Sequence, residues 1–224
     1  MAQTILIAGA SRGIGLEMAK QAAERGDTVI AMVRSESSAG ALEGIASKVL
    51  IADVTDEAAL KAAASQLASN LDLLVCNAGI YRGRGDLNSD DLGADAWSEV
   101  LMTNVAGPFL VIKAFLPSLK TPGGKIAIIS SVMASSARAP GGGYIYRASK
   151  AAVTNIACNL AAELQPQGIA VGSYHPGWVR TDMGGPSAAI SPEESAAGLL
   201  QRFDALSMQT TGVFEDYAGE AIPF

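Results

Sequence analysis

Apolar residues gather in six short runs along this chain, and longer stretches with helical spacing separate them. The runs are TILIAG, DTVIAMV, SKVLIAD, LDLLVCN, KIAIISS and IAVGSYHP. Each run is apolar almost throughout, which is typical of strands covered by other elements on both faces. The pattern therefore predicts six buried strands in a parallel sheet.

The stretches between the runs predict helices at residues 13–25, 56–69, 91–119, 146–165 and 191–206. Asp56, Asp91 and Ser191 stand where N-terminal caps of three of these helices are expected. The polar segment 34–47 is interrupted by glycines and predicts at most a turn or two of helix. Strands alternating with helices predict a doubly wound, Rossmann-type α/β fold in one domain, residues 1–224, with ligands bound at the carboxyl ends of the strands.

Composition narrows the class of protein. The chain has 224 residues, 49% of them hydrophobic, and a net charge of −6, so it is long enough for one sizeable core. The negative charge argues against binding to nucleic acid or to anionic membranes, which both require a basic face. No signal peptide is recognised at the N-terminus, and no apolar segment approaches the roughly 20 residues of a membrane span. We therefore expect a cytoplasmic protein.

Cysteine and histidine are too sparse for a metal site. Cys76 and Cys158 lie far apart in apolar surroundings and are expected to be buried, reduced thiols. His175 has no cluster of Cys, His or carboxylate residues around it, so we predict no metal and a structural role for this side chain.

A glycine-rich turn, GASRGIG, follows the first predicted strand. Gly9 and Gly13 allow a close approach of backbone to ligand, and Gly15 lets the helix pack tightly on the strand. Free amides at such a turn favour a phosphate. Arg12 in this turn and Arg34 after the second strand predict NADP(H) over NAD(H), because a cation matches the 2′-phosphate; solvated surface arginines are the alternative.

The next two strands also end in polar or small residues. Asp53, followed by Val54, can accept a hydrogen bond from an adenine amino group or can cap the following helix. Asn77, Ala78 and Gly79 are small enough for their backbone to lie against a flat cofactor. Together with the glycine turn they predict a cleft.

Tyr146 and Lys150 are spaced one helical turn apart, which places them on one helix face. A nearby ammonium stabilises a phenolate and is expected to lower the pKa of this tyrosine toward neutrality. Pro108 has no N–H, so the carbonyl of Asn104 loses its donor in a helix. That carbonyl either holds a water beside Lys150 for reprotonation or lies at a solvent-exposed kink.

The motifs GASRGIG, NAG, TNVAG, ISS, YRASK and HPGWVRT, in this order, resemble those of the classical short-chain dehydrogenase/reductase family over essentially the whole chain. A bacterial subgroup similar to C-factor-type and carbonyl-reductase-like members is the nearest in pattern. The resemblance implies a catalytic tetrad of Asn104, Ser131, Tyr146 and Lys150, with Tyr146 as the general acid–base. The cofactor contacts that it implies are Gly9, Ser11, Arg12, Gly13, Ile14, Gly15, Arg34, Asp53, Val54, Asn77, Ala78, Gly79, Tyr146, Lys150, Pro176, Gly177, Val179 and Thr181.

Two departures from the family pattern stand out. Ala8 replaces the threonine that often precedes the first glycine. The loop from Thr181 to Ile190 is short, which predicts an open substrate pocket or little substrate selectivity. The residues expected to line the pocket are Met133, Arg138, Tyr144, Trp178 and Met183. We expect NADP-dependent interconversion of a carbonyl compound and its alcohol by a homodimer or homotetramer. The alternative is a C-factor-like signalling protein in which occupancy by the dinucleotide matters more than turnover.

Overall fold

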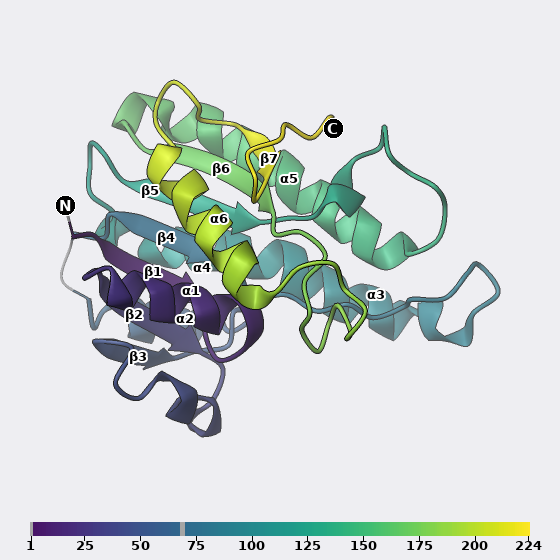
Figure 1. The fold of residues 1–224 in the computed structure, drawn as a ribbon, viewed down its shortest axis with the longest axis horizontal. Coiled ribbons are helices and arrows are strands. Elements are labelled where there is room, and N and C mark those ends of the chain that lie inside the picture. Colours follow the sequence, from purple (N-terminus) through teal and green to yellow (C-terminus); the bar gives the residue numbers. More distant parts are fainter. Residues whose placement is uncertain (1, 68–69) are drawn as a thin grey trace.

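Seven parallel strands form one sheet in this computed structural model, which describes residues 2–67 and 70–224. The strands are β1 (Thr4–Ala8), β2 (Thr28–Val33), β3 (Lys48–Ile51), β4 (Leu73–Cys76), β5 (Lys125–Ile129), β6 (Ala170–His175) and β7 (Phe214–Asp216). Their order is β3-β2-β1-β4-β5-β6-β7 (Figure 1). All six strands predicted from the apolar runs are present, and the Rossmann-type α/β fold is confirmed.

The sequence analysis missed strand β7, which is only three residues long. It pairs with β6 in the register Ser173↔Phe214, and it lies at the edge of the sheet. Such a short segment has no periodicity of its own, so its pairing with β6 is what makes it a strand.

The order of the strands defines where a ligand can bind. β1 pairs with β2 on one side and with β4 on the other, in the registers Thr4↔Thr28 and Ile5↔Leu73. The chain therefore winds outward from β1 to β3 and then crosses to β4. The loops after β1 and β4 diverge at this switch point, and parallel α/β sheets bind ligands in the crevice between such loops.

Helices cover both faces of the sheet (Figure 1). They are α1 (Gly13–Glu24), α2 (Glu57–Ala64), α3 (Ala94–Leu101), the π-helical turn η4 (Met102–Ala106), α4 (Gly107–Phe115), α5 (Tyr144–Leu164) and α6 (Pro192–Ala205). The segment 34–47 forms two short 3₁₀ turns, as expected. The helix predicted over 56–69 ends at Ala64, and residues 68 and 69 of that prediction lie outside the described residues.

Two of the three predicted helix caps are confirmed. The carboxylate of Asp56 accepts hydrogen bonds from the amides of Ala58 and Ala59, and the Ser191 hydroxyl accepts one from Glu194. The prediction for Asp91 was wrong, because Asp91 lies in a 3₁₀ turn and Gly93 precedes α3.

Apolar side chains form one large cluster on each face of the sheet. One face packs β-strand residues such as Leu6 and Ile128 against α2, α4 and α5, with Phe115 at its centre. The other face packs residues such as Ile5 and Val75 against α1 and α6. In this cluster the rings of Phe203 and Tyr174 meet edge to face, with their centres 5.1 Å apart. Burial on both faces explains why the strands are apolar at nearly every position.

The helical stretch Ala94–Ser118 is long and apolar enough, by length and composition, to cross a membrane. The expectation that no segment approaches this length was wrong, because α3, η4 and α4 run on as one helical stretch. Val111, Ile112 and Phe115 from this stretch are buried against the sheet. Packing in the core therefore accounts for part of its hydrophobicity, whereas Leu101, Met102 and Phe109 of the same stretch are exposed.

The two cysteines differ in their surroundings. Cys76 is buried in β4, and burial raises the pKa of its thiol to about 12. The prediction for Cys158 was wrong in part, because this free thiol is exposed on the outer side of α5. Periodicity alone did not separate the two faces of this weakly amphipathic helix.

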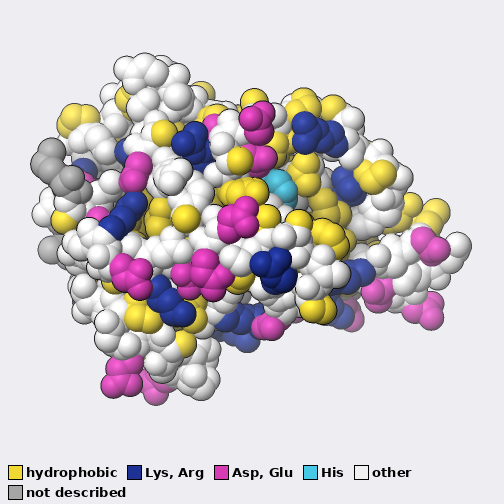
Figure 2. All heavy atoms as spheres, in the orientation of Figure 1, with side chains coloured by type: hydrophobic (Ala, Val, Ile, Leu, Met, Phe, Trp, Pro, Cys, Tyr) yellow, Lys and Arg dark blue, Asp and Glu magenta, His cyan; other side chains and the backbone are white. Residues whose placement is uncertain are grey.

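Acidic and basic side chains are interspersed on the face formed by α1 and α6 (Figure 2). Arg25, at the end of α1, pairs with Asp27 and reaches Asp204 of α6 at 2.9 Å. The ion pair with Asp204 joins the end of α1 to α6.

Candidate active site

The glycine turn after β1 packs directly on the loop after β4. A Cβ atom on Gly9 would lie 2.8 Å from the Cα of Ala78, and one on Gly15 would lie 2.1 Å from the carbonyl oxygen of Gly9. The Asn77 amide donates a hydrogen bond of 2.8 Å to that same carbonyl. The glycines at these two positions are therefore required by close contacts between backbone segments.

The same turn leaves the start of α1 open. No side chain caps this helix, and its first turn carries no acidic residue, so its amide groups are available to an anion. Gly13 has φ +53° and faces Thr181, whose Cγ2 would lie 3.2 Å from a Cβ at that position. Ser11 and Ile14 lie in this turn as well. The geometry fits the phosphates of a dinucleotide lying between the loops after β1 and β6.

The two arginines expected near the adenosine ribose have different surroundings. Arg12 makes an exposed ion pair of 2.8 Å with Asp182, in the loop after β6. Arg34 is exposed at the end of β2, and among the described residues no ion pair or hydrogen bond is recorded for its side chain. Both guanidinium groups therefore lie at the surface, but Arg12 is held in an ion pair.

Asp53 does not cap the helix that follows it, which excludes one of its two expected roles. Its Oδ1 accepts hydrogen bonds from the backbone and hydroxyl of Thr55, at 2.9 and 2.7 Å, while Asp56 is the cap. Val54 packs on α4, where a Cβ on Gly107 would lie 2.9 Å from its Cγ2. Among the described residues, both hydrogen bonds to the Asp53 carboxylate come from Thr55 and reach Oδ1 alone.

The two serines at the end of β5 point in different directions. Ser130 is buried, and its hydroxyl lies 2.6 Å from Thr154 Oγ1 and 3.3 Å from the carbonyl of Lys150. Ser131 accepts a hydrogen bond from the amide of Met133 at 3.1 Å, and hydrogen bonding by Ser131 lowers the pKa of Tyr146. Ser131 is therefore the serine that shares a site with the tyrosine.

Tyr146 and Lys150 are both buried on α5, at 8% and 4% exposure. The Lys150 ammonium lies 5.6 Å from the centre of the Tyr146 ring and donates a hydrogen bond of 2.8 Å to the carbonyl of Ile129. Burial lowers the pKa of Lys150 to about 8. Burial also raises the pKa of Tyr146 to about 12, the reverse of the expected direction. The phenol is consequently protonated at neutral pH.

Asn104 lies in the π-helical turn η4 and is fully buried. Its amide exchanges hydrogen bonds with the backbone of Ile80 at 2.8 and 2.9 Å, and it donates to Ser149 of α5 at 3.1 Å. The helix predicted over 91–119 is interrupted because Pro108 has no N–H to donate. Just before Pro108, the turn η4 is π-helical, so its backbone hydrogen bonds span five residues instead of four. The turn does pass beside α5, as the reprotonation route requires.

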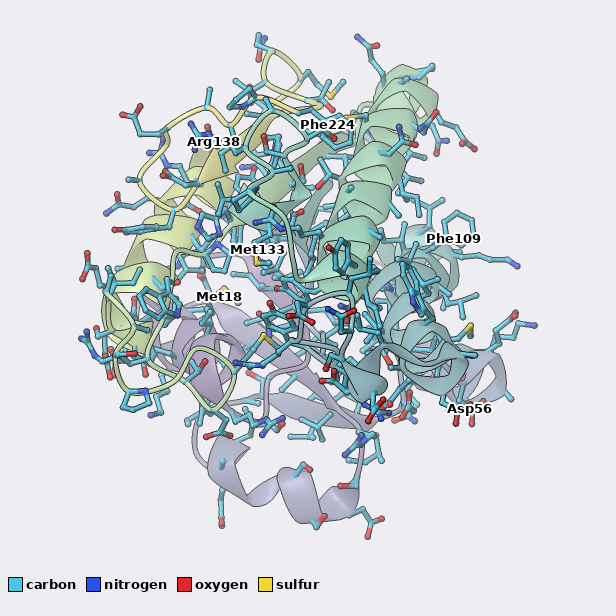
Figure 3. All side chains as sticks on the ribbon, turned by 90° about the vertical axis from the view of Figure 1, so that its right-hand side faces the viewer. Met18, Asp56, Phe109, Met133, Arg138 and Phe224 are labelled. Atoms are coloured by element: carbon cyan, nitrogen blue, oxygen red, sulfur yellow. The ribbon has the colours of Figure 1, made fainter. Side chains whose placement is uncertain are left out.

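Three consecutive glycines with positive φ, Gly141, Gly142 and Gly143, precede α5. At Gly143 a Cβ would also lie 2.9 Å from Met133 Cε, so the loop closes tightly against the start of the helix. The helix predicted over 146–165 begins two residues earlier in the structure, so Tyr144 is the first residue of α5 and not part of the loop. Its side chain is 40% exposed. Figure 3 looks onto this edge of the sheet, with Met133 near its middle and Arg138 on the side of Phe224.

The loop after β6 forms the far side of the cleft. Pro176 is tied to α6 by a 2.6 Å hydrogen bond from the Ser195 hydroxyl, and Gly177 has φ +86°. Val179 is buried, and Trp178 is 55% exposed and donates to the carbonyl of Gly184 at 2.9 Å.

His175 ends β6 just before this loop. Burial lowers the pKa of His175 to about 4, so its imidazole is neutral at pH 7.

Sequence reasoning missed two residues at this edge. The Tyr81 ring stacks on Tyr146 with their centres 4.3 Å apart, and the Arg84 guanidinium lies 4.4 Å from the centre of the Tyr81 ring. A signal was present, because a tyrosine and two arginines directly follow the NAG turn in NAGIYRGR.

Fold and site together define a Rossmann-type α/β protein whose glycine turn and buried Ser131, Tyr146 and Lys150 meet at the carboxyl edge of the sheet. The family model described as short chain dehydrogenase matches residues 3–190. The chain belongs to the short-chain dehydrogenase/reductase family and is an oxidoreductase of that family.

Three similar proteins place the chain within this family. It is 35% identical to C-signal of Myxococcus xanthus over 159 residues, which are 69% of this chain and 93% of the relative. It is 34% identical to a 3-oxoacyl-(acyl-carrier-protein) reductase of Escherichia coli over 203 residues, 88% of this chain and 80% of the relative. The structure of NADPH-bound carbonyl reductase from chicken fatty liver superposes with a TM-score of 0.91 at 31% identity, covering 100% of this chain and 99% of that one.

Proposed function

We propose that this protein interconverts a carbonyl compound and its alcohol with NADP(H), using Tyr146 as the general acid–base. The observation that carries the proposal is the buried Tyr146 phenol, whose pKa Ser131 lowers by hydrogen bonding and which has the Lys150 ammonium one turn away, 5.6 Å from the centre of its ring. The similar carbonyl reductase of known structure contains NADPH. Bound NADPH supplies the hydride, and the protein's own residues supply the proton and hold the charge.

Each residue of the tetrad then has a separate task. The Ser131 and Tyr146 hydroxyls hold the substrate oxygen and stabilise the negative charge that develops on it. Tyr146 gives its proton to that oxygen, which leaves a phenolate beside the ammonium of Lys150. With a pKa near 8, Lys150 can hand on a proton at neutral pH and then regain one. The Asn104 side chain holds η4 against α5 through Ser149. The backbone carbonyl of Asn104 then holds a water beside Lys150, and this water completes the route by which Tyr146 is reprotonated.

The residues that hold the cofactor come from five strand ends. The glycine turn and the start of α1 hold the phosphates, Arg12 and Arg34 hold the 2′-phosphate, and Asp53 binds the adenine. Thr181 binds the carboxamide, and Lys150 binds the nicotinamide ribose. The remaining contacts are Asn77, Ala78, Gly79, Pro176, Gly177 and Val179.

The direct test is to mix the purified protein with NADPH and a panel of aldehydes, ketones and quinones and to follow cofactor oxidation. Cofactor binding is measured in parallel by calorimetry. Oxidation above background with at least one substrate supports the proposal, and no turnover together with no NADPH binding contradicts it.

A second candidate function is a dinucleotide-binding signalling protein, which the similarity to C-signal favours. In that case NADP(H) binds tightly but no member of the panel is turned over. The homo-oligomer and the cytoplasmic location expected from the sequence stay predictions.

The Arg12–Asp182 ion pair leads to a testable prediction about cofactor affinity. Asp182 competes with a 2′-phosphate for Arg12, so Asp182→Asn is expected to raise the affinity for NADPH by about two- to fivefold and to leave NADH binding unchanged. Calorimetric titration at low and high salt measures both, and the gain should shrink at high salt. Asp90→Asn removes the same charge from an exposed turn outside this ion pair and should change neither affinity. An equal gain for NADH would show that Asp182 does not act through the 2′-phosphate.

A further inference from the structure

Four side chains form a continuous column at the candidate site, in the order Arg84, Tyr81, Tyr146 and Lys150. The Arg84 Cζ lies 4.4 Å from the centre of the Tyr81 ring, and the Tyr81 and Tyr146 rings lie 4.3 Å apart with an angle of 20° between their planes. The Lys150 Nζ lies 5.6 Å from the centre of the Tyr146 ring. The column therefore has two aromatic rings in the middle and a cation at each end, an arrangement that cation–π attraction stabilises.

The loop that carries Tyr81 and Arg84 is anchored at three points. The Asn104 side chain holds the backbone of Ile80 from both its N–H and its carbonyl. Gly83 has φ +67°, and a Cβ there would lie 2.8 Å from Ile145 Cδ1, next to Tyr146. The Arg84 guanidinium donates a 2.7 Å hydrogen bond to the carbonyl of Met183. These contacts hold the Tyr81 ring and the Arg84 charge in place.

The outer cation matters because Tyr81 alone disfavours a phenolate. The phenols of Tyr81 and Tyr146 lie on stacked rings, and charge repulsion between two neighbouring ionisable groups disfavours ionisation of each. Besides burial, Tyr81 raises the pKa of Tyr146, whereas Ser131 and Arg84 lower it. The charged or titratable groups facing Tyr146 are Lys150 from α5 and Tyr81 and Arg84 from the loop after β4. Asp182, in the loop after β6, is paired with Arg12.

We propose that Tyr81 and Arg84 are positioning residues for Tyr146: the Tyr81 ring holds the phenol in its reactive orientation, and Arg84 supplies a second positive charge that stabilises the phenolate. This inference rests on the proposed function of Tyr146 as the general acid–base. It gives a role in catalysis to the segment YRGR, which contains no member of the tetrad.

The first test replaces the Tyr81 ring. Tyr81→Leu removes the stacking surface and is expected to lower kcat roughly tenfold or more, because a small displacement of the proton donor costs rate steeply. Tyr81→Phe keeps the ring that stacks on Tyr146, so its kcat should stay within about twofold of that of the original protein. NADPH affinity should stay unchanged in both variants. Equal kcat values for the Leu and Phe variants would overturn the positioning role of Tyr81.

The second test removes the outer charge. Alcohol oxidation requires the phenolate of Tyr146, so its rate rises with pH through the pKa of that group. Arg84→Gln should shift this profile upward by roughly half a pH unit to one unit, and Arg84→Lys should restore most of the shift. The matched control is Arg82→Gln, because Arg82 lies in the same segment but pairs with Glu99. A profile that is unchanged in Arg84→Gln, or shifted equally in Arg82→Gln, would overturn the role of Arg84.

A readout independent of turnover separates this inference from the proposed function. Tyrosinate absorbance is titrated with and without NADP⁺, and the curve of Tyr146→Phe is subtracted to isolate Tyr146 from the other four of the five tyrosines. Arg84→Gln should raise the midpoint of the difference curve. If the midpoint shifts while Tyr146→Phe remains fully active, the column is correct and the general acid–base assignment fails. If the midpoint does not shift, the inference about Arg84 fails, whatever the activity.

Discussion

Replacing Tyr146 by phenylalanine is expected to lower kcat for carbonyl reduction by about a hundredfold to ten-thousandfold, the range that a positioned proton donor contributes. The substitution removes only the hydroxyl and keeps the ring that stacks on Tyr81. The stability of the fold and the affinity for NADPH should therefore change little. Steady-state kinetics with the best substrate of the panel, together with calorimetric titration of NADPH, measure the two effects separately.

Tyr144→Phe is the matched control, since it removes the same hydroxyl two residues earlier from a half-exposed ring. Its effect should be severalfold at most and should fall mainly on KM. Comparable losses of kcat in the two variants would contradict the assignment of Tyr146 as the proton donor.

Gly15→Ala is expected to destabilise the protein by roughly 1–3 kcal/mol and to weaken NADPH binding at least tenfold. Glycine to alanine usually favours a helix, but here the new methyl group would lie 2.1 Å from the Gly9 carbonyl oxygen and 2.5 Å from the Asn77 amide nitrogen. Both are parts of the expected cofactor cradle, so relief of the clash displaces the glycine turn. Urea unfolding and NADPH titration report the two losses.

Gly40→Ala serves as the comparison, because a Cβ at Gly40 would meet no atom within 4 Å and its φ is not positive. That variant should keep its stability and its affinity for NADPH. If Gly15→Ala behaved in the same way, the tight packing of the glycine turn would not be what shapes the cofactor site.

The apolar runs and helical spacing were sufficient to predict six strands and the order of the main helices. Residue types at the helix starts predicted the caps Asp56 and Ser191 correctly, because these side chains bond to amides only two or three residues away. Local signals failed at β7, which is a strand only because β6 lies beside it. They failed also at Cys158, whose side of α5 depends on what packs against the helix.

For the candidate site, the motifs and their order along the chain showed the likeness to one family, and that likeness predicted the tetrad and the cofactor role of the glycine turn. The tertiary structure decided which groups face each other: Ser131 lowers the pKa of Tyr146 while Ser130 lies against Thr154, and Arg12 reaches Asp182, 170 residues away in the chain. It also placed Tyr81 on Tyr146, and the burial of that pair raises a pKa that the i,i+4 lysine alone was expected to lower. The sequence by itself determined the list of chemical groups, because local spacing and motif order are written in it. Only the fold decided their contacts and their proton affinities, because burial and the distances between strand ends arise when the sheet assembles.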